Sequence, residues 1–454
     1  MRRAVSLLVF LALVAENKGE RPYEMKWSTF MSWVGDVLFT PLPIKLPLLD
    51  LLVFALLAWS ATIPAPKGAV VRPVVRSIHL SLAAIVALWL WGVARGGSAH
   101  EALFQLHWFV MMLLLALALA GAMRRPEDLV AVGKAVFFAA LWRATMAFIF
   151  ARIIVKTQHF WPLPMYATTH SDTVLFVTGI VIALAWAAEV RTRKAIVWGL
   201  VSAAWLAIAI QLNNRRLAWV SLVAALAVYY AMLPASRLKR RLVRWAIIAA
   251  PILGIYVAVG WGRTEPIFKP LAALETVSTK EDASTETRDI ENYNLVATLK
   301  TDPLLGTGWG HEYIEESHAY SIKDIFPQYR YIPHNSVLGF LAFTGFAGFA
   351  GTWLVFPVSA FFAARSYRVA KRPVARVAAI VALTEVVIYT NQMYGDMGAV
   401  SGTCAVVMAV AFATSARLPA MVGAWPDGRR VAPPAPPAEP PRTPAPPAVQ
   451  SSRA

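Results

Sequence analysis

Long runs of apolar residues alternate with short polar loops along most of this 454-residue chain. Most of the runs are about 18 to 23 residues long, the length that an α-helix needs to cross the hydrocarbon core of a bilayer. Backbone amides in lipid must be satisfied within their own segment, so the runs predict helices. The predicted spans are residues 47–63, 77–95, 102–123, 130–152, 171–189, 195–212, 217–234, 245–261, 335–363, 377–394 and 398–415.

The first fifteen residues hold two arginines followed by a short apolar run. This pattern fits either a short span or the apolar region of a signal peptide. Counted as a span, it brings the total to about twelve. The pattern as a whole predicts an all-α integral membrane protein.

Two polar stretches divide the chain into four predicted parts. Transmembrane helices occupy residues 1–261 and 335–415, a loop domain occupies 262–334, and a disordered tail rich in Pro and Ala occupies 416–454. The loop domain contains twelve acidic residues against seven Lys and Arg, the reverse of the whole chain. Within it, residues 284–300 predict a helix that stops before Pro303.

The formal net charge of +17 would suit a nucleic-acid-binding protein, but the placement of the charge favours a membrane orientation. The cations gather in short loops that all fall on one face, which is the positive-inside pattern of cytoplasmic loops. We therefore predict a bacterial inner-membrane protein with its tail in the cytoplasm and residues 262–334 in the periplasm. The basic loops contain Lys67, Arg72, Arg76, Arg124, Arg125, Arg191, Arg193, Lys194, Arg237, Lys239, Arg240, Arg241, Arg244, Arg365, Arg368, Lys371, Arg372 and Arg376.

One tight turn carries arginines on the opposite, outer face. Arg215 and Arg216 follow two asparagines between two predicted spans, and this placement violates the positive-inside bias. An anionic partner such as a lipid phosphate or a diphosphate would compensate them. The alternative is that both side chains extend to lipid headgroups. In the outer loop Arg288 lies in the predicted helix, where spacing alone would make it a solvated residue.

Further candidates lie at the end of the same loop. Gly306, Gly308 and Gly310 recur at every second position and could form a backbone nest for phosphate oxygens, although no dinucleotide or P-loop motif surrounds them. His334 precedes the next span, where it could act as a general base, bind substrate, or simply form a hydrogen bond at the interface. Asn335 is placed to cap the helix that follows.

Ionisable residues within spans are costly unless they are paired or face water. Arg143 and Glu385 are two such residues, and they are expected to pair with each other or to line a cavity. His170 and Asp172 begin another span on the outer side. No metal site is expected, because the histidines lack zinc-ligand spacings and the lone Cys404 lies in an apolar span.

The order of these features resembles the O-antigen ligase and polymerase superfamily of bacterial envelope glycan assembly, over roughly residues 30–415. NNRRLAWVSL is similar to the family's arginine-containing turn between two spans. TRDIENYNLVATLKTDPLLGTGWG resembles its stretch of an arginine, a helix and a Pro-Leu-x-Gly-x-Gly segment. PHNSVLGFLAFTGFAGF is similar to its His-Asn start of the following helix.

The resemblance implies a GT-C-like architecture and a donor glycan linked to undecaprenyl diphosphate, with no metal or other cofactor. It implies that Arg288 and either Arg215 or Arg216 bind the diphosphate and stabilise it as the leaving group. His334 would bind the donor or activate the acceptor hydroxyl. The expected substrate-binding set also includes Gly306, Gly308 and Asn335. The family's usual Ser is Asn214 here, so both arginines stay candidates, and Glu286, Asp289 and Glu291 are alternative bases.

These inferences predict a metal-independent, inverting glycosyltransferase of the inner membrane that transfers a glycan to a saccharide acceptor in the periplasm. A lipid-linked repeat unit as acceptor would make it a polymerase, lipid A-core an O-antigen ligase, and a protein an oligosaccharyltransferase. Membrane lipids and other polysaccharide assembly proteins are expected partners. A multi-spanning secondary transporter is the main alternative, although the internal repeats of transporters are not evident. A non-catalytic assembly protein is a third.

Overall fold

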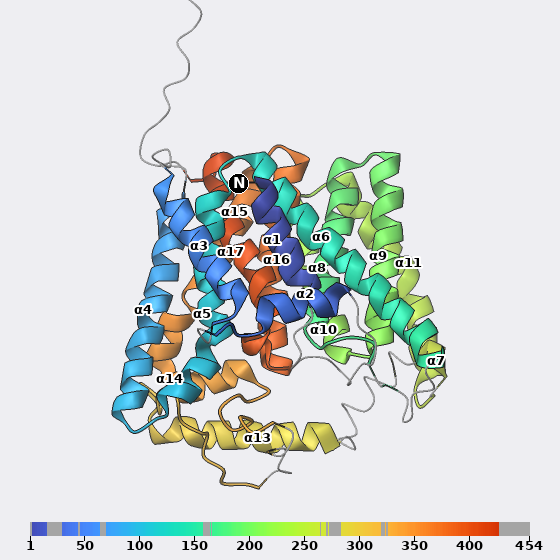
Figure 1. Cartoon of the computed structure of the whole chain (residues 1–454). Coiled ribbons are helices and arrows are strands. Elements are labelled where there is room, and N and C mark those ends of the chain that lie inside the picture. Colours follow the sequence, from blue (N-terminus) through green and yellow to red (C-terminus); the bar gives the residue numbers. More distant parts are fainter. Residues whose placement is uncertain are drawn as a thin grey trace, which may run out of the picture.

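The computed structural model describes residues 2–15, 30–43, 46–63, 70–157, 164, 166–263, 265–268, 271, 283–318, 323 and 326–425, and every regular element in these ranges is helical (Figure 1). The elements are α1 (Arg2–Val14), α2 (Phe30–Phe39), α3 (Leu48–Thr62), α4 (Arg72–Ala94), α5 (Ala99–Ala122), α6 (Pro126–Ile149), the π-helical η2 (Phe150–Ile154), α7 (Val155–Thr157), α8 (Asp172–Val190), α9 (Arg193–Asn213), α10 (Arg216–Met232), α11 (Arg237–Gly260), the 3₁₀ turn η3 (Pro266–Phe268), α13 (Ala283–Thr301), α14 (Ser336–Trp353), α15 (Val355–Val369), α16 (Pro373–Gly395), the 3₁₀ turn η4 (Gly398–Val400) and α17 (Gly402–Met421).

Most of the predicted spans appear as single helices close to their expected bounds. Within the described residues, nine helical stretches are long and apolar enough to cross a membrane, and α2, α3 and α10 are shorter apolar helices. The prediction of an all-α membrane protein is therefore confirmed. The count of about twelve spans and the GT-C-like architecture stay predictions.

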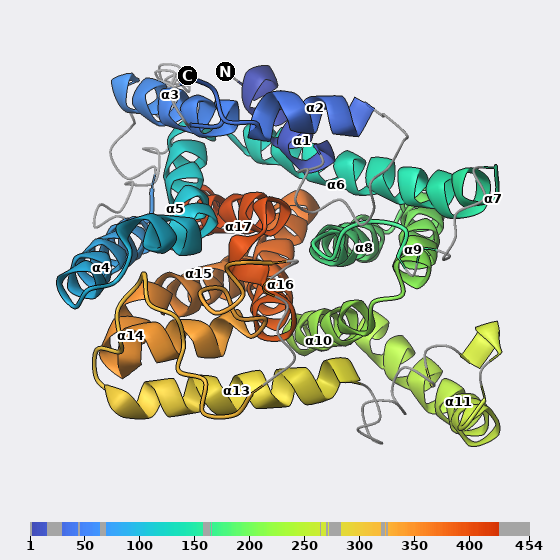
Figure 2. The same cartoon turned by 60° about the horizontal axis from the view of Figure 1, so that its bottom comes forward.

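The centre of the bundle is formed by α16 and α17, which the other helices surround (Figure 2). In α17, 83% of the apolar span is buried within the protein, and the helix packs against α5, α15 and α16. It continues to Met421, so residues 416–421 belong to this helix and the predicted start of the tail at residue 416 is wrong. Residues 426–454, the rest of the predicted tail, lie outside the described residues.

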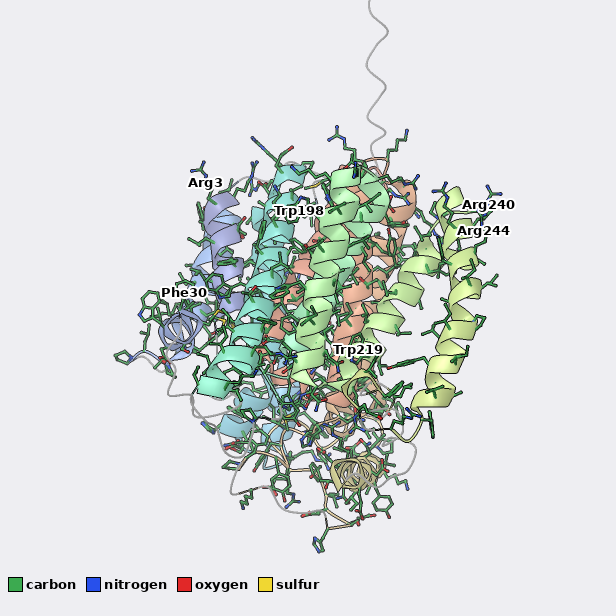
Figure 3. All side chains as sticks on the ribbon, turned by 90° about the vertical axis from the view of Figure 1, so that its right-hand side faces the viewer. Arg3, Phe30, Trp198, Trp219, Arg240 and Arg244 are labelled. Carbon is green, nitrogen blue, oxygen red and sulfur yellow. The ribbon has the colours of Figure 1, made fainter. Side chains whose placement is uncertain are left out.

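The bundle has two chemically different ends. Arg3, Arg240 and Arg244 lie at one end (Figure 3), and α13 lies across the other (Figure 1). At the first end Arg2 forms an ion pair of 2.7 Å with Asp128, at the start of α6. We call these the arginine-rich end and the α13 end. The arginines at one end and the acidic loop helix at the other agree with the charge distribution among the loops that the sequence predicted.

Helix α13 matches the predicted helix 284–300 and ends before the Asp302-Pro303 pair, as expected. It packs against α14, and its polar side chains hold the loop that follows it. The side-chain amide of Asn294 donates to the carbonyl of Ser317 (2.7 Å) and accepts from the amide of Ser317 (2.9 Å). The hydroxyl of Thr298 accepts from the amide of Ile314 at 2.8 Å. These bonds fix the loop against α13.

Of the two predicted alternatives for Arg143 and Glu385, pairing with each other is wrong, whereas Glu385 does line a cavity. Arg143 on α6 instead pairs with Asp172 at the start of α8, with Nε 2.6 Å from Oδ1, and both side chains are almost fully buried. Its Nη1 also donates to the carbonyl of Ala15 at 2.8 Å, which ties the end of α1 to the pair. Glu385 accepts a hydrogen bond from Thr178. Arg143 therefore joins three segments near the α13 end.

A second buried ion pair joins helices at the arginine-rich end. Glu189 on α8 accepts from Nε of Arg376 on α16 at 2.7 Å. The hydroxyl of Tyr367 on α15 donates to the same carboxylate at 2.7 Å, and that of Tyr229 on α10 at 3.4 Å. Four helices thus meet at one carboxylate. A carboxylate and a guanidinium that are paired and hydrogen-bonded in this way are costly to separate.

We expect Glu189→Ala to destabilise the protein by about 3 kcal/mol, because it leaves the Arg376 guanidinium half-buried without its anion. The measurement is thermal unfolding of the purified protein in detergent. Glu127→Gln is the matched control, because the Glu127 side chain is 61% exposed and its contact with Arg2 is long, at 3.9 Å. Equal unfolding midpoints for the two variants would contradict a clamping role for Glu189.

Candidate active site

The turn between α9 and α10 places Arg215 inside the α13 end of the bundle. Asn214 adopts a left-handed conformation (φ 49°), which asparagine tolerates better than most residues, and it ends α9. The side chain of Asn213 accepts from the amide of Thr168 at 3.1 Å and donates to the carbonyl of Thr169 at 3.0 Å. These bonds hold the turn against the segment that precedes α8. As a result, the Arg215 guanidinium lies 3.6 Å from the centre of the Tyr166 ring.

Asp396 is the carboxylate at the centre of this group. It follows the last turn of α16, where its amide donates to the carbonyl of Gln392 at 2.8 Å. One carboxylate oxygen accepts from Nδ1 of His170 at 2.7 Å, and the other lies 4.0 Å from Nη2 of Arg288. Burial alone raises the pKa of Asp396, but the His170 hydrogen bond and the charges of Arg215 and Arg288 outweigh burial, so that the pKa lies below its usual range. Asp396 is therefore an anion near neutral pH.

The group carries more positive than negative charge. Burial lowers the pKa of the Arg215 guanidinium, and the nearby charge of Arg288 adds to this effect. Arginine nevertheless stays charged in proteins. The Nε and Nη2 atoms of Arg215 are buried and make no hydrogen bond with the part of the chain that the structure describes. Two guanidinium groups beside one carboxylate, one of them with unused donors, form a site for an anion.

A histidine–carboxylate pair lies beside this anion site. Nδ1 of His334 is 2.9 Å from Oε2 of Glu291, and the amide of His334 donates to Oε1 at 2.7 Å. Glu291 lies three residues after Arg288 on α13, which places both side chains on neighbouring positions of one helix face. The carbonyl of His334 accepts from the amide of Met397 at 2.8 Å, next to Asp396. The same backbone contact therefore connects the pair to the anion site.

Asn335 joins the start of α14 to α13. Its side-chain oxygen accepts from the amide of Leu338 at 3.0 Å and caps α14, as the sequence predicted. Its side-chain amide donates to Asn292 on α13 at 2.9 Å. Both polar ends of the side chain are engaged, so Asn335 fixes the start of α14, and therefore His334, relative to α13.

Gly306 and Gly308 do not form the predicted backbone nest. The amide of Gly306 donates to Asp302 at 2.9 Å and the amide of Gly308 to Phe343 at 2.8 Å, so neither is free to form a nest. A Cβ on Gly306 would lie 2.4 Å from the backbone of Phe343, and one on Gly308 would lie 2.3 Å from that of Gly92. With positive φ values of 68° and 85°, these positions require glycine for close packing against α14 and α4.

The structure thus brings together Arg215, Arg288 and His334 from the predicted set. The stacking on Tyr166 and the closeness to Asp396 belong to Arg215, whereas Arg216 forms the first residue of α10. Sequence reasoning gave no role to Asp396 and His170 and treated Glu291 only as an alternative base. Asp396 carried a usable signal, because it is an acidic residue at the outer end of an apolar span. Among the described residues, no group of three or more potential ligands could hold a metal ion.

A family model described as O-Antigen ligase matches residues 201–353. This segment contains Arg215, Arg288, Glu291 and His334, whereas His170 and Asp396 lie outside it. A search of curated proteins finds no significant match. The matched segment contains the three motifs and most of the candidate site, and the match supports the resemblance to the O-antigen ligase and polymerase superfamily.

Proposed function

We propose that this protein transfers a glycan from undecaprenyl diphosphate to a saccharide acceptor on the periplasmic side of the inner membrane. The observation that carries the proposal is the arrangement at the α13 end, where Arg215 and Arg288 flank Asp396 and the His334–Glu291 pair lies beside them. An anion site next to a candidate general base is what such a transfer requires. The match of residues 201–353 to the O-antigen ligase family model supports glycosyl transfer as the reaction class.

The two arginines suit a diphosphate leaving group. When the bond between the sugar and the diphosphate breaks, negative charge develops on the departing phosphate oxygens. Guanidinium groups can stabilise this charge with paired hydrogen bonds. The buried Nε and Nη2 donors of Arg215 are already in place, so the site needs little reorganisation as charge develops. This arrangement favours a reaction without a required metal ion.

The His334–Glu291 pair suits the acceptor. When Nδ1–H of His334 donates to the Glu291 carboxylate, Nε2 is left as a proton acceptor. We expect Nε2 to take the proton of the acceptor hydroxyl as that oxygen attacks the anomeric carbon of the donor. The carboxylate then stabilises the imidazolium that forms. Attack opposite the leaving diphosphate gives inversion at the anomeric carbon.

The orientation follows from the charged ends. Loops rich in arginine stay in the cytoplasm, so the α13 end should face the periplasm. The anion site then lies near the outer leaflet, where the diphosphate of a membrane-embedded polyprenyl lipid would be found. In this orientation α17 carries the chain toward the cytoplasm, which supports a cytoplasmic tail.

The decisive test is transfer by the purified protein. We expect it to consume undecaprenyl-diphosphate-linked repeat units in a buffer that contains a chelator of divalent metals. Longer lipid-linked chains would identify a polymerase, and glycan attached to added lipid A-core would identify an O-antigen ligase. Failure to transfer glycan to either acceptor, with intact donor recovered from folded protein, would overturn the proposal.

A further inference from the structure

The site contains a second histidine–carboxylate pair, formed by His170 and Asp396. Nδ1 of His170 lies 2.7 Å from the Asp396 carboxylate. The His170 side chain is 47% exposed, and its Nε2 makes no hydrogen bond with the residues that the structure describes. Like His334, His170 is therefore held through one ring nitrogen and presents the other.

The surroundings of His170 differ from those of His334. The Tyr166 ring contacts the His170 ring edge-on at 5.6 Å and lies 3.6 Å from the Arg215 guanidinium, so one aromatic ring connects the two side chains. The other carboxylate oxygen of Asp396 lies 4.0 Å from Arg288. His170 thus shares its carboxylate with the arginines of the anion site.

The charged groups around His170 come from four segments. Asp396 follows α16, Arg215 precedes α10, Arg288 lies on α13, and Tyr166 precedes His170 in the chain. The nearby Asp172 is paired with Arg143, with 2.6 Å between Nε and Oδ1. A bound diphosphate would bring negative charge next to the His170 ring, and nearby negative charge favours an imidazolium.

We infer that His170 is a third binding group for the donor diphosphate, acting as an imidazolium that donates Nε2–H to a phosphate oxygen. The inference rests on the proposed donor. The proton comes from solvent as the donor binds and returns to solvent when the diphosphate product leaves. Binding and protonation are therefore linked, so donor affinity contains a part that falls as pH rises.

The two histidines would then work in opposite charge states. His334 must be neutral at Nε2 to accept a proton from the acceptor hydroxyl, whereas His170 must be protonated to bind the donor. The site thus divides acid and base roles between two similar pairs.

Calorimetric titration with farnesyl diphosphate tests this inference directly, using the full-length protein in nanodiscs. Titrations in two buffers with different enthalpies of ionisation give the number of protons taken up on binding. Protons that the ligand itself gains or loses cancel when variants are compared at one pH. We expect wild type to take up more protons than either His170→Asn or His170→Gln, and His334→Gln to match wild type in proton uptake.

The two His170 variants separate ligand binding from support of Asp396. In His170→Asn the new side-chain amide can reach the place of Nδ1 and keep the bond to Asp396, whereas in His170→Gln the longer side chain can bring its amide to the place of Nε2. At pH 6.5 we expect His170→Asn to weaken binding by about tenfold or more, the value of one charge-assisted hydrogen bond. His170→Gln should recover part of the affinity and lose the pH dependence.

Three outcomes would overturn the inference. Proton uptake that is unchanged in both His170 variants would exclude His170 as a phosphate-binding imidazolium. It would not affect the proposed donor. Loss of uptake in His334→Gln but not in the His170 variants would assign the proton to the other pair. No binding of farnesyl diphosphate by folded wild-type protein would overturn both this inference and the proposed diphosphate site.

Discussion

Replacing Arg215 with alanine is expected to lower glycan transfer by about 10²- to 10³-fold, the usual effect of removing one preorganised donor from a charge-stabilising site. The physical reason is that Nε and Nη2 of Arg215 are buried donors without a hydrogen-bond partner among the described residues, next to Asp396 and Arg288. The measurement is the rate of product formation from lipid-linked repeat units at saturating acceptor.

Two further variants sharpen this prediction. Arg215→Lys keeps the charge but loses the planar group that stacks on Tyr166, so we expect most of the activity to be lost here too. Arg216→Ala is the matched control within the same turn, and its effect should stay below about tenfold. A larger loss of activity in Arg216→Ala than in Arg215→Ala would show that Arg216, and not Arg215, stabilises the diphosphate.

Glu291→Gln is expected to lower the transfer rate by about 10²- to 10⁴-fold, the range for loss of general acid–base catalysis. Glutamine has nearly the same shape, but its single side-chain oxygen cannot accept from both Nδ1–H and the backbone amide of His334, and it carries no charge to stabilise an imidazolium. The fall should appear in kcat rather than in donor KM, because the pair acts on the acceptor proton. The pH dependence of kcat gives a second measurement of the role of the His334–Glu291 pair.

The control for Glu291 lies on the same helix. Glu286 is exposed on α13, and Glu286→Gln should keep nearly full activity. Equal activity in the Glu291→Gln and Glu286→Gln proteins would exclude the His334–Glu291 pair as the acceptor's base. Retained activity in His334→Gln would lead to the same conclusion by an independent route.

The membrane helices could be predicted because the thickness of a bilayer sets their length and lipid excludes polar residues from them. The turn that carries Arg215 was predicted for a related reason, since short loops between spans are fixed by the spans themselves. The end of α17 was misplaced because Arg417 and Pro419 interrupt the apolar pattern. In the structure Arg417 is buried and donates to the backbone at the end of α5.

The arrangement of the site could not be predicted from the sequence, because it depends on tertiary contacts that the hydrophobic periodicity does not reveal. His170 and Asp396 are 226 residues apart and meet because α8 packs against α16. Arg143 pairs with Asp172 rather than Glu385 because the pairing requires the same depth in the bundle as well as a neighbouring helix. The glycines after α13 were assigned to phosphate because their amide partners, on other segments, could not be foreseen.

The central claim is that one diphosphate binds between Arg215 and Arg288, in front of His334. A cryo-electron microscopy structure of the protein in nanodiscs with undecaprenyl diphosphate measures this directly. We expect density for the diphosphate within hydrogen-bonding distance of both guanidinium groups, with the polyprenyl chain extending into the membrane. A diphosphate bound elsewhere, with the Arg215 donors turned away from it, would contradict the claim.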